Sequence, residues 1–447
     1  MKKFGVSVNP LKTSPALGAA YALQGIKGAI ALFHAAPGCT FLGKVLLTQH
    51  LREPVGLLGT DIKEMPTIMG GWDDLKKRIT DVCEKFKPSL IGVIGTALAE
   101  VRGEDIRKII EDCRLKIEDF KSSIVNSQSS IIYISCPDYM GGFGEGYAKA
   151  IEVVIENLAE NGPVIPNQIN ILPCESLTAG DIEEIKDIIS TFGLKPIVLS
   201  DLSLSMDGSK ERFSNLPLDG TAIDEIKAMG RSSATFSIGE GMKKAGEILR
   251  DRFSIPLYPL SLPIGLEASD NFIRCLMEIT GKKPSERIER WRRKFVDGMV
   301  DTHLLMAGKK AAVGLEGKLC LGISRFCLEM GMQVKGARGK PAPRIKCGAG
   351  SASMSLHDSS RDSKQGGQGT SDLEDLEDMA EGVDLIITNS HGKEISERLG
   401  IPLLRMGFPV FDRFGEPLKL RVGYRGSLNL LFEMANIFYE NRFCNKG

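Results

Sequence analysis

Short apolar runs without strict alternation of polar and apolar residues recur along nearly the whole chain. Strands covered by helices on both faces are apolar throughout, whereas half-exposed strands alternate. Amphipathic stretches such as 180–193 separate the runs, which gives repeated βα units. The sequence therefore predicts an α/β fold of doubly wound, Rossmann-like domains with mainly parallel sheets. The predicted strands are AIALFH ending at His34, 90–96, 131–136, 169–173, 196–200, 234–239, 311–315, 385–390 and 402–407.

The length of the chain and the interruptions of this pattern predict several domains. A chain of 447 residues is too long for one ordinary hydrophobic core. Two long helical stretches, 268–283 and 285–308, interrupt the βα series, and a Gly/Ser-rich segment near 337–371 has the composition of a flexible loop or linker. We expect three α/β domains, namely 1–165 with Cys39, 166–300, and 301–447 with the flexible segment.

Composition excludes several classes of function. The 57 basic and 57 acidic residues balance, so no basic surface predicts nucleic-acid binding. No apolar run reaches the length of a membrane span, and residues 1–20 lack the apolar block of a signal peptide. We therefore expect a cytoplasmic protein. The ten cysteines form no C-x-x-C pair, so neither a zinc ribbon nor a thioredoxin-type site is predicted.

The stretch HAAPGCTFLGKV, from His34 to Val45, raises three possibilities. Its glycines and Lys44 match the spacing of a phosphate-binding loop, but Val45 stands where that motif needs a hydroxyl for Mg²⁺. Cys39 follows a predicted buried strand, and a lone cysteine there is most often an inert buried thiol. The third possibility is one ligand of an iron–sulfur cluster. Such clusters take four ligands, so the others would come from another subunit.

Three further stretches are weaker candidates. GGFGEGY (141–147) could face an anion at the start of a helix, although a tight turn into the helix that follows is the favoured interpretation. His303 lies near a predicted helix end, where packing or the helix dipole explains it. His391 follows a predicted strand, with Ser390 as a candidate cap of the next helix.

In their order along the chain, many of these stretches resemble the β-type chains of the nitrogenase component 1 superfamily, over nearly the full length. The resemblance implies three doubly wound α/β domains, in agreement with the strand pattern. The segments that carry it are 9–54, 94–106, 136–152, 169–186, 193–208, 220–240, 295–314, 384–417 and 422–437. The segment 340–370 departs from the family pattern, and so does Gly43, where related chains commonly have alanine.

The cysteines suggest a position within the superfamily. Its catalytic β chains contribute three cysteines to an eight-iron cluster, and this chain matches only the first, with Cys39. The other two positions hold Leu57 and Ala97, whose alkyl side chains cannot ligate iron. The resemblance therefore implies a scaffold subunit for maturation of the nitrogenase iron-molybdenum cofactor rather than a nitrogen-reducing catalyst. Cys39 would be the metal ligand and cofactor-binding residue for a [4Fe-4S] cluster shared with the partner chain.

The same resemblance implies a set of partners. These are a NifE-type chain in an α2β2 heterotetramer, which would hold most of the iron-molybdenum cofactor precursor, the NifH iron protein, and NifB as precursor donor. Two other interpretations stay open at this point. One is the β chain of a vanadium-type scaffold or of another nitrogenase-like reductase, and the other is a cluster-free α/β protein that binds a small ligand.

Overall fold

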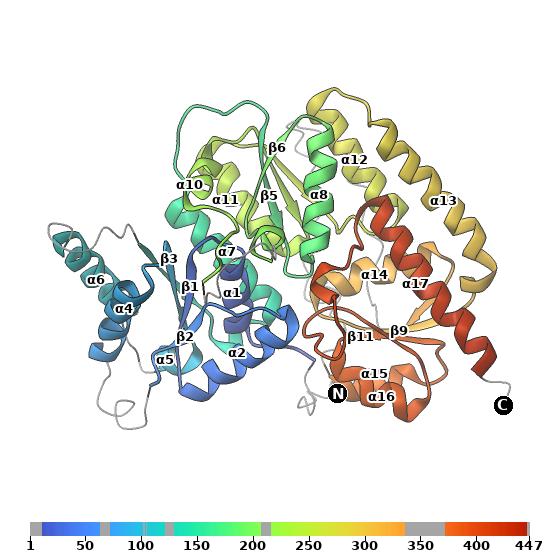
Figure 1. Cartoon of the computed structure of the whole chain (residues 1–447), viewed down its shortest axis with the longest axis horizontal. Coiled ribbons are helices and arrows are strands. Elements are labelled where there is room, and N and C mark those ends of the chain that lie inside the picture. The colour runs from blue at the N-terminus through green and yellow to red at the C-terminus, as the bar shows by residue number, and fades with distance from the viewer. Residues whose placement is uncertain are drawn as a thin grey trace, which may run out of the picture. The chain divides into compact units, whose positions relative to one another are not determined.

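The computed structural model describes residues 11–62, 72–101, 103, 105–120, 129–206, 216–335 and 372–444. The predicted flexible segment, 337–371, lies outside the described residues. Within them the chain forms three sheets of four strands each, with parallel pairing in every register recorded (Figure 1). In the part of the chain so described, no helix has the length and apolar character to cross a membrane. The predicted α/β fold with three doubly wound sheets is confirmed.

In each sheet the strand order shows a doubly wound topology. The first sheet is ordered β2-β1-β3-β4, the second β6-β5-β7-β8 and the third β10-β9-β11-β12. In each sheet the chain thus leaves its first strand in one direction and then crosses back to the other side. The strands are β1 (Ala29–His34), β2 (Leu57–Gly59), β3 (Leu90–Gly95), β4 (Ser130–Ser135), β5 (Gln168–Pro173), β6 (Lys195–Val198), β7 (Ala234–Ile238), β8 (Leu257–Leu260), β9 (Lys310–Gly314), β10 (Gln333–Lys335), β11 (Leu385–Thr388) and β12 (Leu403–Arg405).

The chain separates into two compact units. One comprises Thr13–Glu183 and Lys195–Pro259 and holds the first sheet and nearly all of the second. The other comprises Met1–Lys12, Glu184–Leu194 and Leu260–Gly447, and its described part holds the third sheet. The proposed domain boundaries near 165 and 300 stay predictions.

The helices follow the strands as the sequence pattern requires. The long stretches predicted at 268–283 and 285–308 form α12 (Leu266–Thr280) and α13 (Glu286–Met306). The other α-helices are α1 (Pro15–Gln24), α2 (Pro37–Leu51), α4 (Trp72–Phe86), α5 (Ala97–Val101), α6 (Ile106–Phe120), α7 (Phe143–Leu158), α8 (Ala179–Thr191), α9 (Leu202–Ser205), α10 (Ile223–Ala228), α11 (Lys243–Phe253), α14 (Gly317–Glu329), α15 (Leu373–Ala380), α16 (Lys393–Leu399) and α17 (Gly423–Cys444). Among the described residues, the 3₁₀ turns are η1 (Asp138–Met140), η2 (Met229–Arg231), η3 (Glu240–Met242), η4 (Ser390–Gly392) and η5 (Glu416–Leu418).

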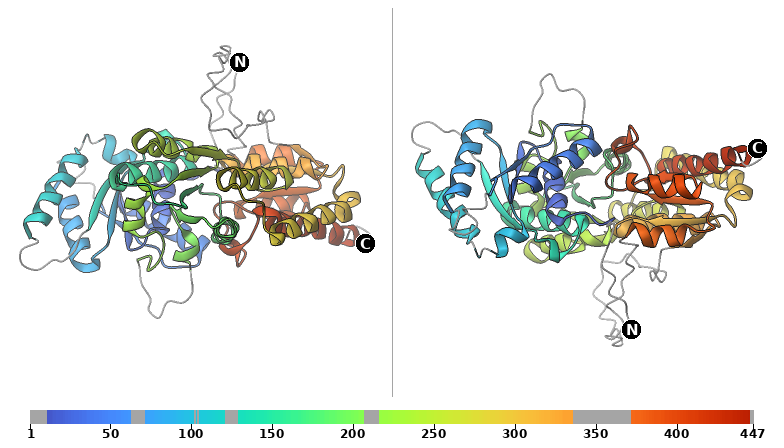
Figure 2. Two further views of the ribbon diagram at one scale, coloured as in Figure 1. Left: turned by 90° about the horizontal axis from the view of Figure 1, so that it is seen from above. Right: turned by 90° about the horizontal axis from the view of Figure 1, so that it is seen from below.

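Helices cover both faces of the first sheet (Figure 2), and this explains its uniformly apolar strands. On one face lie α4 and α6 (Figure 1). Their buried residues form one core with Ile30, Ile91 and Ile131 of the strands. On the other face, α1 contacts β1 and β3, and α7 contacts β4. There Gly92 of β3 leaves room for Leu23 of α1, whose Cδ1 lies 2.4 Å from where a Cβ would stand. Two-sided coverage of this kind leaves the carboxyl ends of the strands as the accessible edge.

Candidate functional site

The first sheet presents a switch point at its carboxyl edge. In the register, His34 of β1 pairs with Gly95 of β3, and Gly95 pairs with Ser135 of β4, so the three strands end at one level. The chain then runs into α2 after β1 and into α5 after β3 (Figure 1). After β4 it runs into η1. In doubly wound sheets, ligands bind outside the carboxyl ends of the strands where the strand order reverses, which is between β1 and β3 here.

Cys39 lies on the first turn of α2, directly above this switch point. Pro37 occupies the first helical turn, where its missing N–H costs nothing, and the Cys39 N–H donates to the Ala36 carbonyl at 3.1 Å. The Cys39 side chain is exposed. The other cysteines whose side chains are described are buried, at positions 83, 113, 136, 174, 275, 320 and 327. Burial raises the pKa of Cys136, at the same edge, to about 12, so its thiol stays protonated and inert.

The backbone that carries Cys39 is held from both neighbouring strands. Thr96, after β3, donates its hydroxyl to the His34 carbonyl at 3.0 Å, and the Ile62 N–H donates to the Ala35 carbonyl at 3.0 Å. The buried His34 ring shares a hydrogen bond between Nδ1 and the Thr60 hydroxyl at 3.0 Å. These contacts fix the turn before α2, so Cys39 is presented in a defined position.

A phosphate loop is ruled out by the helix itself. Pro37–Leu51 is helical throughout, so Gly38, Gly43 and Lys44 lie within α2 and cannot form the loop that wraps phosphate before a helix. Gly43 instead packs inward. A Cβ there would stand 3.3 Å from side-chain atoms of Leu17 and Phe33 and 3.4 Å from Leu57. The absence of a side chain at Gly43 thus lets α2 pack closely on the sheet.

Leu57 lies on β2 and Ala97 follows β3, the two strands beside β1. Leu57 opens β2, opposite Ala31, and is only 1% exposed. Ala97 is the first residue of α5, directly after β3, and is partly exposed. Within the described residues, no group of three His, Cys, Asp or Glu side chains is placed to hold a metal ion. This part of the chain therefore offers Cys39 as a single thiol.

Large apolar side chains are exposed along the same edge. Phe41 (72% exposed) and Leu42 (59%) lie on α2, Val101 (83%) on α5, and Tyr139 (73%) and Met140 (60%) on η1. These three elements follow β1, β3 and β4, whose ends are level. We call Cys39 with these five residues the Cys39 edge. Several exposed large apolar residues on one surface are typical of protein–protein contact sites.

One family model matches residues 14–439, that of the nitrogenase component 1 type oxidoreductases. The chain belongs to this family. Relatives named nitrogenase iron-molybdenum cofactor biosynthesis protein NifN are 36% identical over 436 residues in Nostoc sp. (strain PCC 7120) and 39% identical over 452 residues in Rippkaea orientalis. Both alignments cover 97% of this chain and 94% of the relative. Among solved structures, nitrogenase Cp1 at pH 6.5 is similar with a TM-score of 0.85 and 28% identity, over 99% of this chain and 95% of the other.

The glycine-rich stretch 141–147 of this nitrogenase component 1 family member is a packing element. Gly142 precedes α7, and its N–H donates to the Glu145 carboxylate at 2.8 Å. A Cβ on Gly144 would stand 3.2 Å from the Glu175 carboxylate. The protein's own carboxylates therefore occupy the start of α7, as the tight-turn interpretation favours, although the helix already begins at Phe143, within the glycine-rich stretch.

The two histidine candidates belong to the other compact unit of the chain, not to the unit that carries the Cys39 edge. His303 is exposed in the last turn of α13, where a cation is favourable to the helix dipole. The His391 ring packs edge-on against Phe411 at 5.4 Å between centroids, and burial lowers the pKa of His391. The prediction that Ser390 caps the next helix is wrong, because the Asn389 side chain accepts the His391 N–H at 3.0 Å.

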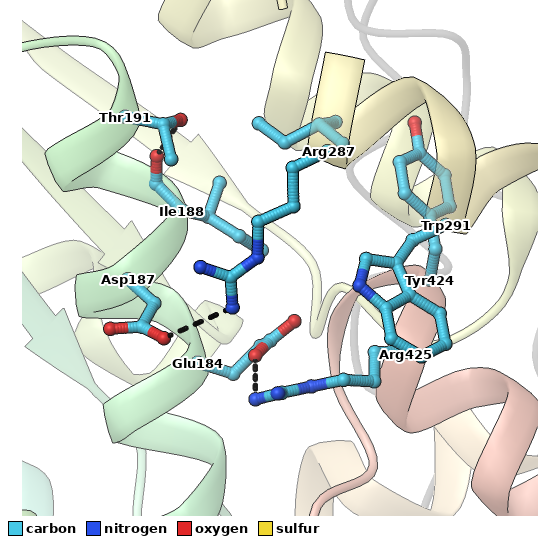
Figure 3. Close-up of a pocket in the computed structure, with 9 residues that line it drawn as sticks. Glu184, Asp187, Ile188, Thr191, Arg287, Trp291, Tyr424 and Arg425 are labelled. Carbon is cyan, nitrogen blue, oxygen red and sulfur yellow. Dashed lines mark hydrogen bonds and ion pairs between the residues drawn. The ribbon is translucent and has the colours of Figure 1, made fainter. Parts of the chain in front are cut away.

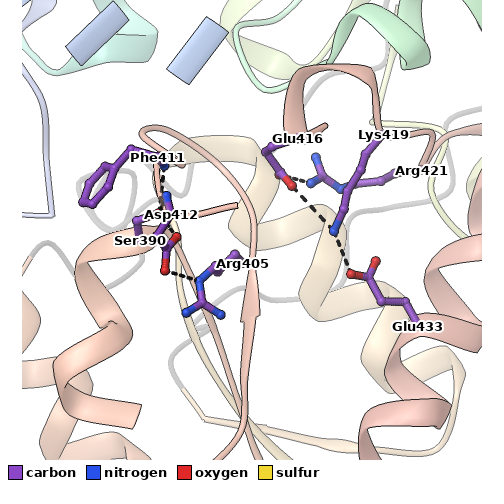
Figure 4. A network of polar contacts seen from close by, with 8 residues as sticks. All are labelled: Ser390, Arg405, Phe411, Asp412, Glu416, Lys419, Arg421 and Glu433. Atoms are coloured by element: carbon purple, nitrogen blue, oxygen red, sulfur yellow. Dashed lines mark hydrogen bonds and ion pairs between the residues drawn. The ribbon is translucent and has the colours of Figure 1, made fainter. Parts of the chain in front are cut away.

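Ser390 instead belongs to a polar network at the edge of the third sheet (Figure 4). Its hydroxyl donates to Asp412 and accepts the Phe411 N–H at 2.9 Å, and Arg405 Nε donates to the Asp412 carboxylate at 2.6 Å. A second group of contacts in the same unit joins buried Glu416 to Arg421, and Lys419 to Glu433 at 2.6 Å. These charges pair with one another, so the contacts stabilise the segment between β12 and α17.

Replacing Asp412 with asparagine should lower the stability of the protein by an amount that depends on pH. Burial opposes ionisation, but hydrogen bonds from Ser390 and Arg405 outweigh it and lower the pKa of Asp412. A lowered pKa contributes stability above the ordinary carboxyl pKa of about 4, and this is lost as pH falls through the folded-state pKa. We expect Asp412→Asn to cost about 1–3 kcal/mol near neutral pH, and less below about pH 4.

Chemical denaturation of the unchanged protein and of the Asp412→Asn variant measures the difference in their stability. The range of pH 3–8 is chosen around the carboxyl pKa of about 4. Asp378→Asn is the control, since Asp378 is exposed on α15 of the same unit. A penalty for Asp412→Asn that does not change with pH would contradict the assignment.

Proposed function

We propose that this chain is a scaffold subunit for maturation of the nitrogenase iron-molybdenum cofactor, which pairs with a NifE-type chain and shares a [4Fe-4S] cluster with it through Cys39. Its family and the names of its relatives support the role in cofactor biosynthesis. The exposed Cys39 thiol at the switch point of the first sheet is the observation that carries the proposal.

The residues at the Cys39 edge fit such a cluster. Iron–sulfur clusters are held by thiolates, and Cys39 is the exposed cysteine among those whose side chains are described. The cluster and its thiolate ligands are anionic, and the N-terminal turn of α2 favours negative charge. The three remaining ligands would be cysteines of the NifE-type chain. When bound, the cluster supplies one-electron transfer between proteins.

The alkyl side chains at Leu57 and Ala97 separate this proposal from a nitrogen-reducing catalyst. Leu57 is part of the packed interior between β2 and α2, so a ligand at that position would have to replace core volume. Ala97 lies at the edge but carries no donor atom. We therefore propose a four-iron cluster with one ligand from this chain, and not the eight-iron cluster of the catalytic β chains.

The apolar residues of the Cys39 edge extend the proposal to partners. Their burial by a second chain would exclude water from the cluster, and cluster binding would in turn stabilise the assembly. We propose an α2β2 heterotetramer in the cytoplasm, with the cofactor precursor held mainly by the NifE-type chain. NifB would deliver the precursor, and the NifH iron protein would dock to supply electrons, molybdenum and homocitrate.

A matched pair of leucine variants tests the partner surface. Leu42 on the Cys39 edge and Leu328 on α14 are each 59% exposed. We expect Leu42→Glu to weaken association with a co-expressed NifE-type chain by about tenfold or more, because it puts a charge into a desolvated contact. Leu328→Glu should leave the affinity unchanged within about twofold. Analytical ultracentrifugation of the purified mixtures measures both, and an equal effect of the two variants would exclude the Cys39 edge as the interface.

A further inference from the structure

The polar contacts nearest to Cys39 differ from those of the other compact unit. There, two arginines pair with two carboxylates around a small pocket between α8, α13 and α17 (Figure 3). The pairs are Arg287 with Asp187 and Arg425 with Glu184, which link α8 to the other two helices. The contacts beside Cys39 instead hold a turn that carries an exposed thiol, so they can act on a ligand of the proposed cluster.

A buried histidine lies five residues before Cys39 in the sequence. His34 is the last residue of β1, and its side chain is completely buried. Burying a polar ring is costly unless its nitrogens have hydrogen-bond partners. Nδ1 of His34 lies 3.0 Å from the hydroxyl oxygen of Thr60, which directly follows β2, and this hydroxyl donates to the Phe33 carbonyl at 3.4 Å. The two side chains therefore link the end of β1 to the segment after β2.

The segment after β2 also pairs with the end of β1 through its backbone. The Thr60 N–H donates to the Phe33 carbonyl at 3.0 Å, and the Ile62 N–H donates to the Ala35 carbonyl at 3.0 Å. Asp61, between them, has a φ of 54°, in the left-handed region that residues other than glycine seldom adopt. Such a conformation persists where the surrounding contacts fix it. This segment is therefore clamped onto the turn that leads from β1 into α2.

Thr40, the residue after Cys39, packs against the end of β2. A Cβ on Gly59, the last residue of β2, would stand 2.4 Å from the Thr40 hydroxyl oxygen, so this close approach requires glycine. Gly59 is itself fixed, because Arg78 Nε of α4 donates to its carbonyl at 2.9 Å. Cys39 and Thr40 are adjacent on the first turn of α2. A displacement of the end of β2 would therefore be passed on to the Cys39 thiol.

We propose that His34 and Thr60 are positioning residues for Cys39 as a ligand of the shared [4Fe-4S] cluster. This role rests on the proposed function, because it requires that Cys39 is a cluster ligand. The hydrogen bond between the two side chains holds the segment after β2 against the first turn of α2, and that turn holds the Cys39 thiolate in one position. Neither side chain has to touch the cluster. Residues that support a metal ligand in this way contribute about tenfold or more to metal affinity.

Thr60→Val is the decisive variant, because it removes the hydroxyl with little change in the size of the side chain. Thr60 is half-buried, whereas His34 fills core space and its loss would leave a cavity. Thr60→Ser keeps the hydroxyl and should behave like the unchanged protein. Thr48→Val is the control, since it makes the same replacement at an exposed position of α2.

Hydrogen exchange of the full chain, read by mass spectrometry, measures how firmly the turn is held when no cluster is bound. We expect the backbone amides of residues 33–42 to exchange about fivefold faster in Thr60→Val, the effect of losing one hydrogen bond. Thr60→Ser and Thr48→Val should exchange at the rate of the unchanged protein. Equal rates in all of these proteins would overturn the proposal, because Thr60 then does not hold the turn.

The anaerobic complex with a NifE-type chain measures the effect on the cluster. Thr60→Val should bind the full amount of iron, because Cys39 is present, but should release it to an iron chelator about tenfold faster. Its reduced-state EPR signal should change in shape, which a loss of stability alone would not cause, and Thr60→Ser should restore both properties. A release rate and an EPR signal equal to those of Thr48→Val would overturn the proposal. A failure of the proposed function is distinct, because the cluster of the unchanged complex would then be absent or would survive Cys39→Ala.

Discussion

Replacing Cys39 with alanine is expected to abolish the [4Fe-4S] signal of the complex between this chain and a NifE-type partner. The thiol is exposed on the first turn of α2 and fills no core space, so its removal takes away a ligand without leaving a cavity. A cluster that loses one of four thiolates at a subunit interface opens to solvent and is lost. Iron analysis and reduced-state EPR of the anaerobically co-expressed complex measure the effect.

A second cysteine variant separates ligation from any general effect of a missing thiol. Cys320 on α14 is 3% exposed, and its Sγ lies 4.0 Å from the Val313 carbonyl, so it is a packed side chain. Cys320→Ala should lower the stability of the chain slightly and leave the iron content and the EPR signal unchanged. Cys39→Ala should leave the stability of the chain unchanged and remove the iron and the EPR signal. Unchanged iron content and an unchanged EPR signal in Cys39→Ala would contradict the assignment of Cys39 as a cluster ligand. Eight irons bound to the chain alone would contradict the argument from Leu57 and Ala97.

The fold was predictable from sequence wherever a strand is buried on both faces. All nine predicted strands are present, because each lies in a short run in which apolar residues predominate. The missed strands are β2 (Leu57–Gly59), β8 (Leu257–Leu260) and β10 (Gln333–Lys335), which lie at sheet edges with three or four residues each. Segments this short carry no readable period by themselves, and the equally short edge strands β6 and β12 were predicted only because they lie within the longer runs 196–200 and 402–407.

Only part of the candidate site could be predicted from the sequence. Cys39 could be singled out from sequence because a strand end, a proline and a glycine precede it directly. The apolar residues around it could not, since Phe41, Val101 and Tyr139 follow three different strands and meet only through the register of the sheet. Sequence motifs locate single residues, whereas the surfaces that those residues serve are products of tertiary structure.

Gly146 shows how the glycine-rich stretch acts through packing, and Gly146→Ala is expected to be among the most destabilising single changes. Gly146 of α7 faces α1, where an added Cβ would stand 1.8 Å from the Pro15 carbonyl oxygen. Gly18 of α1 faces α7 in the same manner, 1.8 Å from the Phe143 oxygen. The obstacles are backbone atoms of the opposite helix, so no side-chain rotation can relieve them. The two helices must separate to admit a methyl group.

Two opposing effects decide the size of the change. Alanine is favoured over glycine inside a helix by about 1 kcal/mol. Overpacking a tight core costs about 1–3 kcal/mol and occasionally more, and here the helices α1 and α7 also lose their contact with each other. We expect a net loss of about 3 kcal/mol or more, which for a unit of this size lowers Tm by roughly 6–12 °C.

Gly241→Ala provides the matched control for this prediction. Gly241 lies in η3 of the same unit, is exposed, and has no atom within 4 Å of the position that a Cβ would take. The same methyl group should change stability there by no more than about 0.5 kcal/mol. Differential scanning calorimetry of the two variants compares them directly. If Gly146→Ala is as stable as Gly241→Ala, then α1 and α7 do not pack at the close distance described, and the position of β1 and Cys39 relative to α7 would need revision.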